Sequence, residues 1–218
     1  KDPLFLNFRI KSKQENIYNV MANNLSNSLA PKLLDKKYSY QYKLNGAIRN
    51  FGKVPLNDIK EKVVIMIDGR SSLFVETKLE EFVNIATSTG GIMQSVRFDA
   101  IKGASEPLEE YIDYNRTKMT LCLPNISSKP KNFPSFTALD NGCQFVAMCL
   151  QKKDSNLDYY NNTYFKNYPI MLKPLELRES FSVMRLPNPI REDMLYEQPN
   201  TNFGPLGEKS FSENPNKL

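Results

Sequence analysis

A run of five consecutive apolar residues, 63–67, restricts the fold of this 218-residue chain more than any other segment. The run is Val-Val-Ile-Met-Ile, and Asp68-Gly69 follows it directly. A short apolar run that is rich in β-branched residues predicts a buried strand, and an Asp-Gly pair predicts a turn at its end. We therefore expect a fold built around a sheet, with a strand that ends at Asp68.

Segments of strand-like and helical periodicity alternate on both sides of this run. Before it, the pattern predicts a buried strand at 4–10, a helix at 14–29, and a surface loop or edge ribbon within 35–57. After it, the pattern predicts helices at 77–87 and 108–114 and strands at 92–98, 119–123 and 143–150. Strands that alternate with helices indicate βαβ units and a parallel sheet, so the expected class is α/β.

Composition excludes several classes of function. A hydrophobic share of 40% is enough for a core, and no run of 18 apolar residues or signal-peptide layout is present, so we expect neither a membrane span nor secretion. The net charge of +5 is spread over the chain and comes mostly from Lys, which does not favour a nucleic-acid partner. Cys122, Cys143 and Cys149 lie in apolar runs, as buried reduced thiols do, which favours a reducing compartment.

The composition changes at Glu179. Residues 179–218 contain five prolines and many Asn, Ser and Gly residues, which predicts an extended arm. Such an arm is either a disordered terminus or a segment that orders on a neighbouring subunit. The second interpretation, with protein partners bound through the arm, is favoured by spaced apolar anchors: Phe181, Met184, Leu186, Tyr196 and Phe203.

The segment 142–148 and a few residues after it resemble the closing motif of phosphoinositide-specific phospholipase C barrels. The residues that carry the resemblance are Gly142, Gln144, Lys173, Pro174 and Arg178. The resemblance covers roughly 3–178 and implies a TIM-type barrel, incomplete at its N-terminus because the first two strands of the family have no counterpart before Lys1. It implies a partial barrel at 1–178, followed by the arm at 179–218, with the retained motif residues serving packing.

Five positions depart from the family pattern. Arg9 stands where a glutamate binds calcium, Met66 and Asp68 stand where two lysines contact phosphates, and Leu121 and Leu123 stand where an arginine and a tyrosine contact the inositol ring. A guanidinium cannot ligate Ca²⁺, and a carboxylate repels phosphate. The resemblance therefore implies a degenerate site with no catalytic residues and no metal cofactor. Asp68 is the one carboxylate at a strand end where barrel active sites lie, and its structural alternative is a turn cap.

The chain contains no histidine, whereas the family acts through two. Our preferred hypothesis is a non-catalytic phospholipase C-like barrel that serves as a structural or interaction component of a larger assembly, in an intracellular reducing compartment or a virus particle. The alternative is the larger part of a calcium-dependent phosphoinositide phosphodiesterase whose histidines lie upstream or on a partner chain. A third hypothesis, peripheral binding to lipid surfaces, depends only on the +5 charge.

Overall fold

The computed structural model describes residues 2–44, 47–48, 51–87, 91–102 and 107–179. The chain divides into two units after Glu179. Apart from Glu179 itself, the predicted arm and its five anchors therefore lie outside the described residues. The first unit, Lys1–Glu179, contains every described helix and strand.

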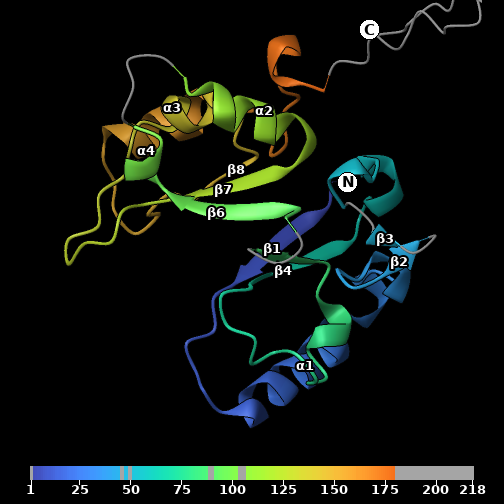
Figure 1. Ribbon diagram of the computed structural model, residues 1–218. Helices are drawn as coiled ribbons and strands as arrows, with labels where there is room; N and C mark the ends of the chain where they lie inside the picture. The colour runs from blue at the N-terminus through green and yellow to red at the C-terminus, as the bar shows by residue number, and fades with distance from the viewer. Residues whose placement is uncertain (1, 45–46, 49–50, 88–90, 103–106, 180–218) are drawn as a thin grey trace, which may run out of the picture. The chain divides into compact units, whose positions relative to one another are not determined.

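Two three-stranded parallel sheets form the framework of this unit (Figure 1). The first contains β1 (Leu4–Phe8), β4 (Val63–Asp68) and β5 (Ile85–Thr87) in the order β1-β4-β5. The second contains β6 (Met93–Arg97), β7 (Met119–Leu123) and β8 (Phe145–Val146) in the order β6-β7-β8. The predicted α/β class with parallel strands is confirmed, but in the described part of the chain the strands do not close into a barrel.

The outer face of the first sheet is covered by α1 (Glu15–Leu29). Side chains alternate along β4, so Ile65 and its neighbours two residues away face α1, where they meet Tyr18, Ala22 and Leu25. Tyr18 and Ala22 are each 1% exposed, which makes this contact the centre of one apolar core. The helical spacing in 14–29 thus predicted a helix that the structure contains.

The opposite face of the same sheet shares a second core with β6, β7 and β8. Val64 and Met66 of β4 pack in one cluster with Met93, Met119 and Leu121 of the second sheet. An aromatic contact spans the two sheets as well, since the rings of Phe5 and Phe145 lie 5.2 Å apart. One continuous apolar layer therefore joins both sheets.

The outer face of the second sheet is covered by α2 (Glu109–Thr117) and α3 (Ser135–Asp140). Cys122 of β7 packs there against Phe133, Ala138 and Cys143. All three cysteines are free and buried, as their apolar surroundings in the sequence predicted. Beyond β8 follow α4 (Ser155–Tyr159) and a single π-helical turn, Tyr160–Tyr164.

The remaining elements are short. An antiparallel ribbon of β2 (Lys43–Leu44) and β3 (Ala47–Ile48) lies where the edge ribbon was expected. The 3₁₀ turns are Ala30–Lys32, Lys36–Tyr38, Phe51–Lys53, Leu56–Ile59, Glu80–Phe82, Phe98–Ala100 and Leu175–Leu177. Within the described ranges, none of the helices has the length and apolar character needed to cross a bilayer.

Three predictions about elements were wrong or too broad. The segment 77–87 is not a helix, because it contains the turn Glu80–Phe82 and then β5. The strand predicted at 143–150 is limited to Phe145–Val146. Lys173 and Pro174 do not close a strand; they precede the 3₁₀ turn Leu175–Leu177, for which Pro174 is the N-cap residue.

Candidate functional site

The carboxyl ends of β1 and β4 bring charged side chains together. The register pairs Phe8 with Ile67, so Arg9 and Asp68, one residue further along each strand, lie next to each other. Arg70 follows Asp68 across the predicted Asp-Gly turn. In α/β folds, ligands bind in the crevice outside the carboxyl ends of parallel strands, so this is where a site is expected.

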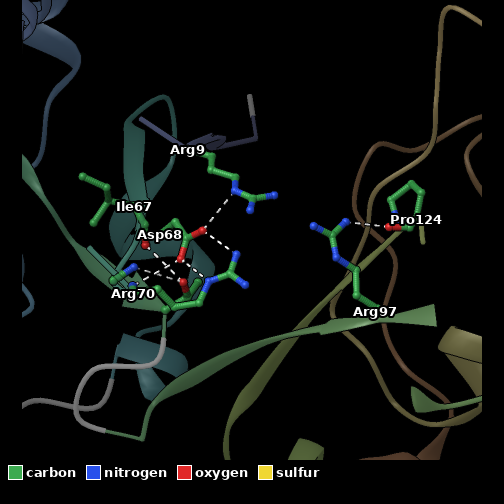
Figure 2. Close-up of polar contacts among 8 residues, drawn as sticks. Arg9, Ile67, Asp68, Arg70, Arg97 and Pro124 are labelled. Atoms are coloured by element: carbon green, nitrogen blue, oxygen red, sulfur yellow. Dashed lines mark hydrogen bonds and ion pairs between the residues drawn. The ribbon is translucent and has the colours of Figure 1, made fainter. Parts of the chain in front are cut away.

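Asp68 is held between two guanidinium groups (Figure 2). Arg70 binds it with two hydrogen bonds, from Nε to Oδ1 at 2.9 Å and from Nη2 to Oδ2 at 2.6 Å, and its backbone N–H donates to Oδ1 at 3.2 Å. Arg9 Nε lies 3.4 Å from Oδ2. The Asp68 side chain is only 15% exposed, whereas the side chains of Arg9 and Arg70 are 48% and 50% exposed. We call these three residues the strand-end cluster.

These contacts fix the charge state of the strand-end cluster. Hydrogen bonds from Arg70, with a smaller contribution from the charge of Arg9, hold the pKa of Asp68 below its usual value. The same pairing raises the pKa of Arg70. The carboxylate therefore stays ionised, and its oxygens accept from arginine rather than facing open solvent. Such a group is poorly suited to act as a general acid, and the turn-cap role expected for Asp68 is present in its bond from the Arg70 backbone.

Two neighbouring strands end in the same region. Thr87, at the end of β5, accepts a hydrogen bond from Gly69 N at 3.3 Å and donates one to Ile67 O at 3.3 Å, which ties β5 to the turn after β4. Arg97, at the end of β6, donates from Nη1 to the carbonyl oxygen of Pro124 at 2.6 Å (Figure 2). Arg97 thus secures the loop after β7, whereas Arg9 and Arg70 converge on Asp68.

The other three substituted positions belong to the apolar core. Met66 and Leu121 are 3% and 6% exposed, and Leu123 packs against the same cluster. Their side chains fill the space between the two sheets. At these positions the chain has packing contacts in place of polar groups that would read a substrate.

The closing-motif residues form a different network, at the amino ends of β7 and β8. Gln144 Oε1 accepts from Thr120 N at 2.8 Å, and its Nε2 donates to the carbonyls of Asn115 and Lys118, each at 2.9 Å. Lys173 Nζ donates to the Asn115 carbonyl at 2.7 Å. All of these contacts connect the end of α2 to the starts of the two strands. We call this network the amino-end network.

Gly142 and Arg178 complete the amino-end network. Gly142 follows α3 with φ of +75°, and a Cβ there would lie 3.1 Å from Asn115 Cβ. Its N–H donates to Leu139 O at 2.8 Å, closing the helix end as a C-terminal glycine commonly does. Arg178 Nε donates to Lys173 O at 2.5 Å. Burial lowers the pKa of Lys173 to about 8.

Sequence reasoning missed two residues that hold these clusters together. Arg70 is the stronger partner of Asp68, and its position two residues beyond a strand-ending Asp was an available signal. Asn115 is 1% exposed and receives contacts from both Gln144 and Lys173, but an Asn inside a predicted helix gave no such signal. In the part of the chain that the structure describes, no three His, Cys, Asp or Glu side chains are grouped so as to hold a metal ion.

Comparison with solved structures identifies a similar fold. The chain is similar to the crystal structure of PLC21, a phospholipase C, from L. pealei, with a TM-score of 0.54 and 18% identity. It is also similar to PLC21 from S. officinalis, with a TM-score of 0.52 and 19% identity. Each match covers 72% of this chain and 24% of the other, so the chain spans about a quarter of the length of those proteins.

No family model and no curated protein matches the sequence. At 18–19% identity, the structural likeness shows a phospholipase C-like fold alone.

Proposed function

We propose that this chain is a non-catalytic phospholipase C-like module that acts as an interaction component of a larger assembly. The observation that carries the proposal is the strand-end cluster, in which Asp68 is bound by Arg9 and Arg70. Where the resemblance implies a calcium-binding glutamate, a guanidinium lies beside the remaining carboxylate. Its positive charge opposes a divalent cation, and the carboxylate oxygens are already used as acceptors.

The apolar core strengthens this interpretation. Met66, Leu121 and Leu123 pack against one another's neighbours between the sheets, so a single substitution would not restore polar groups there. Packed apolar side chains at strand positions stabilise a fold but offer no hydrogen bonds to a phosphorylated ring. We infer that the module retained the framework and lost the substrate contacts.

For the architecture, we propose that the two sheets are consecutive parts of a TIM-type barrel. Six parallel strands that share one apolar layer support this, as does an apolar groove beside the edge strand β1. The groove has a volume of about 390 Å³ and is lined mainly by Phe8, Ile17, Val20, Met21 and Leu25. A further strand and helix would cover both the groove and the open edge of β1.

The absence of catalysis is tested by a turnover assay. The full chain is incubated with vesicles that contain phosphatidylinositol 4,5-bisphosphate over a range of Ca²⁺ concentrations, with an active phospholipase C as the positive control. The proposal predicts no release of inositol phosphates above the buffer rate. Calcium-dependent turnover would establish the alternative, a phosphodiesterase, and would prompt a search for histidines encoded upstream or on a partner chain.

The role in assembly is tested by shortening the chain. The full chain and a chain that ends at Arg178 are expressed in the native source and separated by sedimentation. We predict that the full chain migrates in a large complex or particle and that the shortened chain does not. Normal incorporation of the shortened chain would rule out assembly through the arm. Salt-sensitive binding of both chains to anionic liposomes would instead favour the lipid-surface hypothesis.

A further inference from the structure

A row of aromatic side chains lies on the surface formed by α3, α4 and the π-helical turn. The ring centroids of Phe136 and Tyr159 are 6.3 Å apart, and those of Tyr159 and Tyr164 are 5.8 Å apart, both in edge-to-face geometry. Phe136 and Tyr159 are 44% and 45% exposed. We call these three residues the aromatic row. Large rings that remain nearly half exposed side by side mark an interaction surface.

The aromatic row is fixed in position by buried neighbours. Ala138 and Leu157 anchor α3 and α4 from below, with exposures of 0% and 5%. Asp154 caps α4 by accepting a hydrogen bond from Leu157 N at 3.1 Å. Asn132 links this cap to the preceding loop, since its Nδ2 donates to Asp154 Oδ1 at 3.1 Å and to Lys152 O at 2.9 Å. A surface held in this way loses little conformational entropy on binding.

We propose that the aromatic row binds the proline-containing segment 185–191 of a second copy of this chain. This inference rests on the proposed function, because it names the surface that receives the arm. The segment reads Arg-Leu-Pro-Asn-Pro-Ile-Arg, with Pro187 and Pro189 two residues apart. In a polyproline II conformation two residues span about 6.2 Å, which matches the spacing of adjacent rings in the aromatic row. Proline-rich segments commonly dock on aromatic-lined surfaces in this conformation.

Charge complementarity favours the same pairing. Arg185 and Arg191 flank the two prolines. On the receiving surface, Asp158 precedes Tyr159 in α4, and Asp140 at the end of α3 is close enough to Tyr164 to help raise the pKa of that phenol, behind the larger effect of burial. The carboxylates of these two aspartates give the aromatic row acidic neighbours for the guanidinium groups.

The proposal is tested by self-association of the full chain. Sedimentation equilibrium of the wild type should show reversible association. The double variant Phe136→Ala/Tyr159→Ala and the double variant Pro187→Ala/Pro189→Ala should each raise the dissociation constant by about tenfold or more, since buried aromatic anchors dominate such contacts. The matched controls are Tyr168→Ala, which removes another exposed ring, and Pro205→Ala, which removes another arm proline; both should associate like the wild type.

Mixing the two double variants separates this contact from others. Each retains one half of the contact, so the mixture should form a heterodimer although neither variant associates well alone. Far-UV circular dichroism checks that both are folded. A wild type that stays monomeric, or a mixture that does not associate, overturns the proposal. If ending the chain at Arg178 abolishes association but the aromatic-row variant still associates, this surface is wrong while assembly through the arm stands.

Discussion

The two ends of the parallel strands differ in what their polar side chains do. At the carboxyl ends, Asp68 forms ion pairs with Arg9 and Arg70, whose side chains are about half exposed. At the amino ends, Gln144 bonds to backbone groups around a nearly fully buried Asn115. The first cluster consists of charges that neutralise one another near solvent, whereas the second consists of hydrogen bonds that join α2, β7 and β8.

This difference parallels how barrel folds divide their work. Residues at the carboxyl ends of barrel strands serve function, and residues at the amino ends serve stability. Here the residues that carry the resemblance lie in the amino-end network, and the departures are at the carboxyl ends or in the core between the sheets. A chain that retains a framework without its chemistry would show this distribution, because selection for folding acts on the amino-end network alone.

The largest effect is expected for Gln144→Leu. This change leaves the Thr120 N–H and the carbonyls of Asn115 and Lys118 without their side-chain partner, in a region where Thr120 is 0% exposed. Unpaired buried polar groups should lower the free energy of unfolding by about 3 kcal/mol. Gln94→Leu is the control, since Gln94 makes one bond to Thr120 Oγ1 and should cost about 1 kcal/mol in urea denaturation. Equal losses for the two variants would contradict a special role for Gln144.

Gly142→Ala should have the next largest effect. Gly142 and Gly91 both have a positive φ, at +75° and +67°, but only at Gly142 would a new Cβ meet Asn115 Cβ at 3.1 Å. We expect Gly142→Ala to lower stability by about 2 kcal/mol and Gly91→Ala by about 1 kcal/mol, since both incur the backbone cost. Thermal unfolding of the two variants measures the difference. A greater loss for Gly91→Ala would show that close packing at Asn115 is unimportant.

Asp68→Asn should cost less, about 1 kcal/mol at neutral pH, because the arginine partners are half exposed and screened by solvent. The lowered pKa of Asp68 means that its contribution is present above the unfolded-state pKa near 4 and is lost as the pH falls further. The gap in stability between wild type and variant should therefore shrink from pH 7 to pH 3. A gap that widens in acid would mean that Asp68 is not stabilised by Arg70 and Arg9.

The smallest effect concerns Lys173. Its pKa of about 8 in the folded protein lies below the usual value near 10.5, so the unfolded chain binds more protons between these two values. Stability of the wild type relative to Lys173→Met should therefore rise from pH 8 to pH 10, by less than about 1 kcal/mol because solvent partly shields the ammonium. Urea midpoints at both pH values measure it, with the exposed Lys129→Met as control. A fall over this range would contradict burial of Lys173.

The sequence predicted most of the first sheet and its covering helix. The continuous apolar run 63–67 and the helical spacing in 14–29 were clear because packing and local preference agree there. The segment 77–87 was wrongly predicted as a helix because its apolar residues also fit helical spacing. In the structure Asn84 bonds to Ile65 through both its side chain and its backbone N–H, and the following residues pair with β4. This long-range pairing overrides the local pattern.

The candidate site was only partly predictable. Arg9 and Asp68 were each singled out, but their contact depends on the pairing of β1 with β4, two strands that are separated by a helix and a ribbon. The helix α4 was missed although Asp154 provides a recognisable cap. The amino-end network was expected to serve packing, yet its centre, Asn115, depends on three segments that meet only in the folded chain.

Calcium binding by the full chain tests the central claim most directly. A ligand that binds only the folded state raises the free energy of unfolding, by about 2.7 kcal/mol at a hundred times its dissociation constant. Because the Asp68 carboxylate is bound by Arg9 and Arg70, the account predicts that millimolar Ca²⁺ leaves the thermal midpoint no higher than the same concentration of Mg²⁺ does. A saturable, Ca²⁺-specific rise that Asp68→Asn abolishes would contradict it and would place a working metal site at the carboxyl ends of the strands.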